Sequence, residues 1–401
     1  MYKKLTITII AILMLLNPIM AGDWTSFGHD YTHQGYADDA SDFVTNLWIF
    51  NLGNSTHSSP AISGDYIYIV SNSGQLYSIN MENGEENWHM DLGSNTNSSP
   101  VIYNETLYIG SEDSFMAIDI DTHKKIWEYS TSSPISSTPY INDGVVYVGC
   151  NDGHFYGFNN ESGEVELDVD LDGQLQSSPI VINETAYIAS TNSKVYAINI
   201  NSESVEWEYS TGDSIYSSPA YADGRIFIGS DDGTFYALDC ENGSVDWEVE
   251  LNDVVRGSPT TDEYNNNVYV GSNEGNLTCL DIRDGTIKWS YSTSGAVEST
   301  PAIKDNLIVF GSDNGNVYVL NKYSGQLEFD YNPGTMLFNS PITSSPVIYG
   351  NSLFVAGHDG YLYSININKH EAPSSIFLYY TIAIIIIVLA AIVIAIRKLK
   401  R

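Results

Sequence analysis

Only a few residues in this sequence combine the side-chain types and the spacing that catalysis or metal binding requires. His29 and His33 lie four residues apart, a spacing that brings two imidazoles onto one face only in a helix. The surrounding residues predict irregular structure, so packing or solvent exposure is the favoured interpretation of this pair. The sequence contains no GxSxG, HExxH, P-loop or CxxC motif. It therefore predicts no catalytic residue and no metal ligand, which weighs against an enzyme without deciding the question.

Three aspartates at alternate positions, Asp168, Asp170 and Asp172, are similar to the start of a calcium-binding loop. An EF-hand loop beginning at Asp168 would need a bidentate Glu at its twelfth position, which here is Pro179. Apolar residues separate the aspartates, and such alternation is typical of a strand with one solvated face. We therefore favour a solvated strand and leave calcium binding open.

A further set of polar residues stands directly before a recurring Ser-Ser-Pro-like triplet. The flanking positions repeat closely, whereas this residue differs in all eight copies and is always polar. If the triplet opens the innermost strand of each repeat, the eight side chains form a ring at one mouth of a central channel. An uneven ring on a repeating scaffold is a candidate binding site, and the alternative is a solvated rim without a ligand. The eight residues are His57, Asn97, Ser136, Gln176, Tyr216, Arg256, Glu298 and Thr343.

The triplet marks an internal repeat. Each unit contains an alternating β-branched segment, a Gly-containing turn, a second strand, another turn and a last strand with a large apolar residue. This order predicts four short strands per unit, so the whole sequence predicts an all-β, eight-bladed β-propeller. The spacing of the triplets, 40, 39, 40, 40, 40, 42 and 45 residues, is typical of propeller blades. The triplets end at Pro60, Pro100, Pro139, Pro179, Pro219, Pro259, Pro301 and Pro346.

The large residue on the last strand has a fixed place in each unit, and we expect it to pack between neighbouring blades. The strand that carries Trp48 precedes the first triplet, whereas the eighth unit ends without its outer strand. We therefore expect the N-terminal strand to complete the last blade, which closes the ring and removes an exposed sheet edge. The residues at this place are Trp48, Trp88, Trp127, Leu167, Trp207, Trp247, Trp289 and Phe329.

The segments Ala237–Trp247 and Cys279–Trp289 resemble the tryptophan-docking repeat of pyrroloquinoline-quinone-like propellers, and Asp23–Tyr36 is similar to the segment that precedes many of them. The resemblance covers residues 23–367 and implies the fold, but not one function. The family includes quinoprotein alcohol and sugar dehydrogenases and a lipoprotein of the outer-membrane barrel-assembly machinery. For the dehydrogenases the resemblance implies a disulfide between adjacent cysteines, a calcium ion and a catalytic Asp.

This chain has neither adjacent cysteines nor long insertions between its repeats. We therefore carry over no catalytic residue and predict no cofactor, leaving pyrroloquinoline quinone (PQQ) and calcium open. The three cysteines, Cys150, Cys240 and Cys279, are an odd number, so at least one thiol has no intramolecular partner.

The two ends of the chain predict export and membrane anchoring. A basic start, a short apolar run and a small residue indicate a signal peptide. Near the other end, 21 uncharged residues are long enough to cross a bilayer as a helix, and the basic residues after them indicate a cytoplasmic end. A cleaved sorting signal is the alternative, but the linker has no LPxTG-type motif, which favours a retained helix. The expected parts are a signal peptide at 1–21, a leader packing on the propeller at 22–45, the propeller at 46–368, a linker at 369–375, the transmembrane helix at 376–396 and the tail at 397–401.

Outside the signal peptide, the transmembrane segment and the tail, the chain has 10 basic and 50 acidic residues, a formal net charge of −40. Such a surface repels nucleic acid, so we expect no nucleic-acid partner. Export also makes N-glycosylation of several sequons a reasonable expectation. The sequon asparagines are Asn54, Asn97, Asn104, Asn160, Asn183, Asn242 and Asn276.

Together these features predict a single-pass cell-membrane protein with its propeller outside the cell. We expect a binding or scaffold module for protein or glycan at the cell surface. A PQQ- or metal-dependent oxidoreductase of the same fold is one alternative, and a structural component of the cell envelope is the other.

Overall fold

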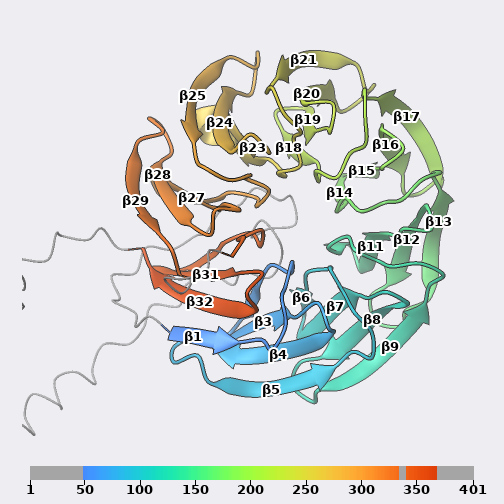
Figure 1. Ribbon diagram of the computed structural model, residues 1–401. Helices are drawn as coiled ribbons and strands as arrows, with labels where there is room; N and C mark the ends of the chain where they lie inside the picture. Colours follow the sequence, from blue (N-terminus) through green and yellow to red (C-terminus); the bar gives the residue numbers. More distant parts are fainter. Residues whose placement is uncertain (1–47, 334–339, 368–401) are drawn as a thin grey trace, which may run out of the picture. The chain divides into compact units, whose positions relative to one another are not determined.

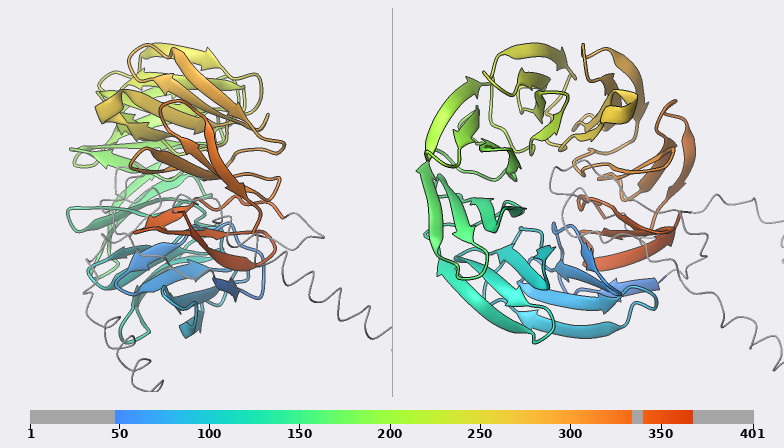
Figure 2. Two further views of the ribbon diagram at one scale, coloured as in Figure 1. Left: turned by 90° about the vertical axis from the view of Figure 1, so that its left-hand side faces the viewer. Right: turned by 180° about the vertical axis from the view of Figure 1, so that it is seen from behind.

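The computed structural model describes residues 48–333 and 340–367 of the chain. Within these ranges the strands form eight sheets of four strands each, and Figures 1 and 2 show the sheets arranged as blades around one axis. The predicted all-β, eight-bladed propeller is confirmed. His29, His33 and the segments predicted to be a signal peptide, a leader, a transmembrane helix and a tail lie outside the described residues. No helix in the described ranges is long and apolar enough to cross a membrane.

The first seven blades are built outward from the axis in chain order, whereas the eighth has β1 as its outermost strand. In every blade the innermost strand begins directly after the Ser-Ser-Pro-like triplet (Figure 1). The innermost strands are β2 (Ala61–Ser63), β6 (Val101–Tyr103), β10 (Tyr140–Asn142), β14 (Ile180–Ile182), β18 (Ala220–Ala222), β22 (Thr260–Asp262), β26 (Ala302–Lys304) and β30 (Val347–Tyr349). The second strands are β3 (Tyr66–Val70), β7 (Thr106–Gly110), β11 (Val145–Gly149), β15 (Thr185–Ala189), β19 (Arg225–Gly229), β23 (Asn267–Gly271), β27 (Leu307–Gly311) and β31 (Ser352–Ala356).

The two outer positions of each blade follow the same order. The third strands are β4 (Gln75–Asn80), β8 (Ser114–Asp119), β12 (His154–Asn159), β16 (Lys194–Asn199), β20 (Thr234–Asp239), β24 (Asn276–Asp281), β28 (Val317–Asn321) and β32 (Tyr361–Asn366). The outermost strands are β5 (Glu86–Asp91), β9 (Lys124–Ser130), β13 (Val165–Asp170), β17 (Ser204–Ser210), β21 (Val245–Glu250), β25 (Ile287–Ser292), β29 (Leu327–Tyr331) and β1 (Trp48–Asn51).

Burial changes along the radius of each blade. In β19 the consecutive residues Ile226, Phe227 and Ile228 are all fully buried, because the sheet is packed between two neighbouring sheets. In the outermost strand β21 only Trp247 is buried and the residues on either side of it are exposed. The core therefore lies between blades, and β-branched and aromatic residues fill it.

The first and last described segments of the propeller lie side by side. Strand β1 pairs antiparallel with β32, with Trp48 opposite Ser364 and Asn51 opposite Tyr361, and supplies the fourth strand of that sheet. Nearer the axis, the Ser345 N–H donates to Ser59 Oγ at 2.9 Å. The same bond between equivalent residues joins other neighbouring blades, as from the Ser178 N–H to Ser218 Oγ at 2.9 Å. The eighth blade is thus joined to the first as other neighbouring blades are joined.

Tryptophans on six of the eight outermost strands pack against the next blade, and Leu167 and Phe329 take this place in the other two. Trp207 Nε1 donates to the Cys240 carbonyl at 3.0 Å, and its indole covers Gly243, which adopts a φ of +70°. Trp88 differs, because His123 takes the place of the glycine and its ring centroid lies 4.7 Å from that of Trp88. The equivalent indole donors are Trp48 to Met81, Trp127 to Asn160, Trp247 to Ile282 and Trp289 to Lys322.

The sixth blade departs from the repeat where the short 3₁₀ helix η1 (Glu263–Asn265) joins β22 to β23. Asp262 precedes η1, and its carboxylate lies 2.8 Å from Lys322 Nζ of the seventh blade. The side chains of Asp262 and Lys322 are only 1% and 5% exposed. Asn265 Nδ2 also donates to both oxygens of Asp262. A buried, hydrogen-bonded ion pair therefore holds these two blades together.

Candidate binding site

The eight residues before the triplets are brought together with a second set of eight around the propeller axis. The second set lies at the turns between the second and third strands. In every blade the backbone N–H of the turn residue donates to a backbone carbonyl of the linker that precedes the triplet, at 2.8–3.0 Å. This carbonyl belongs to the residue two positions before the member of the first set. We call the first set the linker ring, the second the turn ring, and both together the axial surface. The turn ring is Asn72, Glu112, Asn151, Thr191, Asp231, Asn273, Asp313 and His358.

Alternation in the extended linker explains why the linker-ring side chains reach this surface. Ile135 before Ser136 and Ser137 after it are both buried, so the side chain between them points to the opposite side. Ile135 packs against Gly110 of the preceding blade, where a Cβ would lie only 2.4 Å from a methyl of Ile135. The linker is therefore fixed by the core, and the linker-ring position is left free to vary.

One part of the axial surface is built around a fixed arginine. Arg256 donates from Nε and Nη2 to the two oxygens of Asp231, at 3.0 and 2.7 Å. Its Cζ lies 4.5 Å from the ring centroid of Tyr216. The hydrogen bonds to Asp231 raise the pKa of Arg256, so it stays charged. The carboxylate of Asp231 and the ring of Tyr216 together hold the guanidinium of Arg256 in place, although this side chain is still 41% exposed.

Glu298, at the next blade, interacts electrostatically with this arginine, and Asp313 interacts with Glu298. Asn273 Nδ2 donates to Glu298 Oε1 at 3.2 Å. Burial and the nearby Glu298 raise the pKa of Asp313, and Asp313 Oδ1 is buried without a hydrogen-bond partner among the described residues. We call the part of the axial surface from Tyr216 through His358 to His57 the charged half.

Two histidines meet where the eighth blade adjoins the first. The ring centroids of His57 and His358 lie 4.4 Å apart. Thr343 Oγ1 lies 2.8 Å from His358 Nε2, and Asn72 Nδ2 lies 2.8 Å from His57 Nδ1. Burial, and then the neighbouring His57, lower the pKa of His358. The neutral form of His358 is therefore favoured at the junction of the two blades.

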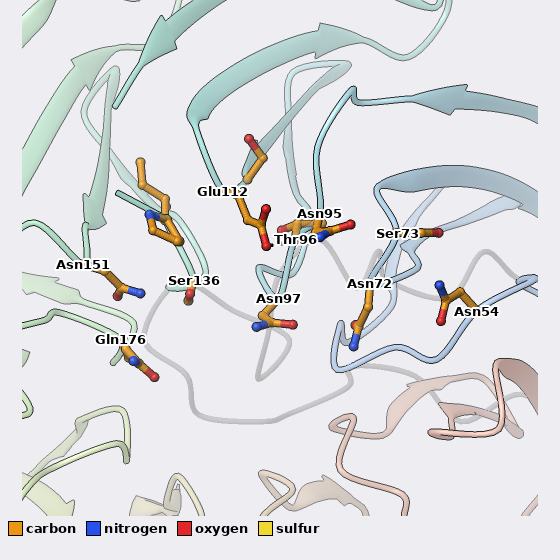
Figure 3. Close-up of a pocket in the computed structure, with 13 residues that line it drawn as sticks. Asn54, Asn72, Ser73, Asn95, Thr96, Asn97, Glu112, Ser136, Asn151 and Gln176 are labelled. Atoms are coloured by element: carbon orange, nitrogen blue, oxygen red, sulfur yellow. Dashed lines mark hydrogen bonds between the residues drawn. The ribbon is translucent and has the colours of Figure 1, made fainter. Parts of the chain in front are cut away.

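The rest of the axial surface, which we call the amide half, has a different chemistry. It surrounds a cavity of about 420 Å³, and Figure 3 shows side chains from neighbouring blades along its edge. Asn97, Ser136, Asn151 and Gln176 line it, and Glu112 is the one ionisable residue among the described residues of its lining. None of these described lining residues is aromatic. The arrangement can exchange several hydrogen bonds with an uncharged ligand.

The repeat, the docked tryptophans and the axial surface can now be compared with known proteins. A model of the family described as outer membrane protein assembly factor BamB matches residues 44–135, 103–218 and 207–375. The chain belongs to this family. The predicted resemblance to pyrroloquinoline-quinone-like propellers is thereby confirmed. No curated protein sequence matches the chain.

Solved structures share the family's fold at low sequence identity. BamB from Moraxella catarrhalis is 18% identical, with a TM-score of 0.68, over 81% of this chain and 100% of that chain. The computationally designed Ika8 protein is 17% identical, with a TM-score of 0.68, over 79% and 98%. Quinohemoprotein alcohol dehydrogenase from Comamonas testosteroni is 14% identical, with a TM-score of 0.72, over 86% and 80%. At these identities the likeness establishes the fold alone.

The three aspartates at 168, 170 and 172 lie on or next to β13, where Leu167 and Val169 are buried and Asp168 and Asp170 are exposed. Asp168 Oδ1 lies 2.6 Å from His154 Nδ1. Within residues 48–333 and 340–367, no group of three or more His, Cys, Asp or Glu side chains is placed to hold a metal ion. The strand alternates as the solvated-strand interpretation expects.

The hydrogen bond that the His154 ring donates to the Asp168 carboxylate raises the pKa of His154 above its ordinary value. We expect Asp168→Asn to lower this pKa toward about 6.5 and Asp170→Asn to lower it less, because Asp170 acts only at a distance. In the wild type the pair stabilises the fold below the unfolded-state pKa of His154, and this contribution is lost as pH rises through the folded-state pKa. Titration of the His154 ring proton by NMR measures both variants. A His154 titration that Asp168→Asn leaves unchanged would contradict the assignment.

The dehydrogenase alternative requires a quinone site. Cys150, Cys240 and Cys279 are free thiols, the first and third of them buried, and burial raises the pKa of Cys150 to about 12. The disulfide of adjacent cysteines implied for the dehydrogenases cannot form from these positions. The residues present therefore do not fit that quinone clamp, and we derive no redox step for this chain.

The sequon asparagines divide between the two faces of the propeller. Asn54 and Asn97 line the cavity of the amide half. Asn276 begins β24 on the same face, and Asn104, Asn160, Asn183 and Asn242 lie in turns of the opposite face.

Sequence reasoning identified the linker ring but missed the turn ring. A signal was present, because the turn residue varies between a recurring Ser and a recurring Gly in most units, as in Ser230-Asp231-Asp232-Gly233. The variation of two positions about 15 residues apart does not show that they are neighbours. The backbone hydrogen bonds between linker and turn show it.

Proposed function

We propose that this chain is a membrane-anchored extracellular module that binds a partner protein through the charged half of its axial surface. The observation that carries the proposal is the cluster of Tyr216, Arg256 and Asp231. Tyr and Arg are enriched among residues that dominate protein-binding energy. Because Arg256 is already held by Asp231 and Tyr216, little side-chain entropy is lost when a partner covers it. The family description, an outer membrane protein assembly factor, supports a protein partner.

The electrostatics favour a partner with a basic contact surface. Arg256 lies close to the carboxylates of Asp231 and Glu298, Asp313 interacts with Glu298, and the exported part of the chain is strongly acidic. Complementary charge speeds encounter and rejects acidic competitors, and both effects weaken as salt is raised. Binding through the charged half should therefore be faster at low ionic strength.

Anchoring and orientation are the part of the proposal supported by sequence. The 21 uncharged residues at 376–396 and the basic residues after them favour a single span with the propeller outside. Mass measurement of the mature C-terminus tests whether this segment is retained.

Site-specific photo-crosslinking in the native envelope tests the protein-binding proposal. A crosslinking residue at Tyr216 or Glu298 is expected to give a covalent adduct with a defined protein, and one at exposed Asn201, in a turn of the opposite face, is not. Arg256→Ala should reduce the Glu298 adduct about tenfold, because removal of a central Arg commonly costs 1–2 kcal/mol or more. Equal adducts from both faces, or none from the charged half, would overturn the proposal.

A further inference from the structure

The cavity of the amide half holds polar groups that the protein itself leaves unused. Asn151 Oδ1 is buried and has no hydrogen-bond partner among the described residues. Asn97 is exposed and Ser136 is half-buried, and neither side chain makes a hydrogen bond to the described part of the chain. All three residues line one cavity (Figure 3). Buried polar groups are almost always satisfied by protein, water or a ligand, so the unpaired Oδ1 of Asn151, with two accessible polar side chains beside it, indicates a site that something else completes.

The hydrogen-bonding needs of these groups restrict the ligand. Asn151 needs a donor for Oδ1, or an acceptor if the amide is rotated by half a turn. The amide of Asn97 offers both a donor and an acceptor, and so does the hydroxyl of Ser136. A ligand hydroxyl group satisfies each of these in either orientation, because it donates and accepts at one atom.

The charge of the lining excludes most other ligand classes. Within residues 48–333 and 340–367, Glu112 is the one ionisable residue that lines the cavity, and Asn95 Nδ2 donates to its carboxylate at 3.2 Å. The same part of the chain supplies no cationic side chain to hold a phosphate or a carboxylate here. The described residues of this lining include none of the aromatic, Met and Arg side chains that mark protein interfaces, whereas Tyr216 and Arg256 occur in the charged half. The two halves therefore differ in the class of ligand that they suit.

We infer that the amide-half cavity binds a neutral, hydroxyl-rich ligand, namely a short segment of an uncharged oligosaccharide. A volume of about 420 Å³ lies in the lower part of the range for small-ligand sites, which suits a short segment rather than a branched glycan. Asn151 and Ser136 would bind ligand hydroxyls directly. The inference goes beyond the proposed function, because it assigns a ligand class to the half of the axial surface that the partner-protein proposal does not use.

An array of neutral oligosaccharides, including N-acetylated ones, provides the probe. The full chain is produced in a host that does not N-glycosylate proteins, because Asn54 and Asn97 are sequon residues at the cavity. It is purified in a detergent without a sugar head group. Calorimetry with the array member that binds best then measures the dissociation constant for the wild type and the variants.

Asn151→Ala and Ser136→Ala are each expected to weaken binding about fivefold to tenfold, the effect of losing one hydrogen bond. The matched control is Asn273→Ala, which changes the same turn position outside the cavity and should leave the affinity within about twofold.

Two results would overturn the inference: no binding to any member of the array, or binding that Asn151→Ala and Ser136→Ala leave intact. Thermal unfolding of each variant shows that weaker binding is not a loss of fold. The photo-crosslinking experiment tests protein binding by the charged half, whereas calorimetry tests oligosaccharide binding by the cavity. Either proposal can therefore fail without the other.

Discussion

Replacing Gly243 with Ala is expected to destabilise the propeller by roughly 3 kcal/mol or more. Gly243 has a φ of +70°, and a methyl group there would lie 2.5 Å from Cε3 of Trp207. The tryptophan cannot move away freely, because its Nε1 donates to the Cys240 carbonyl at 3.0 Å and its ring is packed between two blades. Urea unfolding of the full chain in detergent, followed by tryptophan fluorescence, measures the loss.

Gly224→Ala is the matched control for this prediction. Gly224 has a similar φ of +74°, but no atom lies within 4 Å of the position its Cβ would take. Its substitution should cost only the left-handed backbone strain, about 1–2 kcal/mol. In a Trp207→Ala background, Gly243→Ala should fall to the same cost. Equal losses for Gly243→Ala and Gly224→Ala in the wild-type background would show that the indole contact is not what requires glycine.

The second large effect is expected from Lys322→Met, which leaves the Asp262 carboxylate buried without its cation. Asp262 is 1% exposed and lies 2.8 Å from Lys322 Nζ. Removing one member of such a pair commonly costs about 3–5 kcal/mol, because the remaining charge is not solvated. The hydrogen bonds from Asn265 to Asp262 place the expected loss at the lower end. Lys194→Met breaks the exposed pair with Glu208 and should leave the unfolding midpoint nearly unchanged.

The pH dependence of the Lys322→Met variant identifies the cause. An unpaired buried carboxylate has a raised pKa, so the folded variant binds a proton that its unfolded chain releases near neutral pH. Its stability should therefore rise, relative to the wild type, as pH falls from 7 toward 5. Adding Asp262→Asn to Lys322→Met should recover part of the loss at pH 7. A loss independent of pH and unaffected by Asp262→Asn would indicate lost packing of the lysine stem instead.

Both predictions concern contacts between blades, which position the axial surface. Each linker is held by the buried residue before the linker-ring position and by a backbone hydrogen bond to its own blade's turn. A change that loosens adjacent blades should displace the axial side chains as well. The proposed ligand sites thus depend on a scaffold whose packing residues repeat while its axial residues do not.

Because the units repeat, the number of blades and the order of their strands could be predicted from the sequence alone. A core residue such as Ile228 and a docking residue such as Trp247 recur at one place in successive units, because every blade must bury the same faces. The Ser-Ser-Pro-like triplets and the turn glycines recur for a similar reason. The irregular parts of the fold could not be predicted in this way. Nothing in the sequence shows that η1 places Asp262 against Lys322, or that His123 takes the place of a glycine beneath Trp88.

For the candidate site, too, the sequence determined some features and the tertiary structure determined the others. The sequence by itself determined the eight-bladed propeller and the linker ring, because both follow from a period of about 40 residues and from the one position that breaks it. Only the tertiary structure decided that Arg256 is held by Asp231 of the neighbouring blade, and that Asn97, Ser136 and Asn151 share one cavity. The physical reason is that side chains from different blades meet only once the ring has formed. A local pattern fixes which face of its own strand a residue occupies, but not which residue of the next blade it meets.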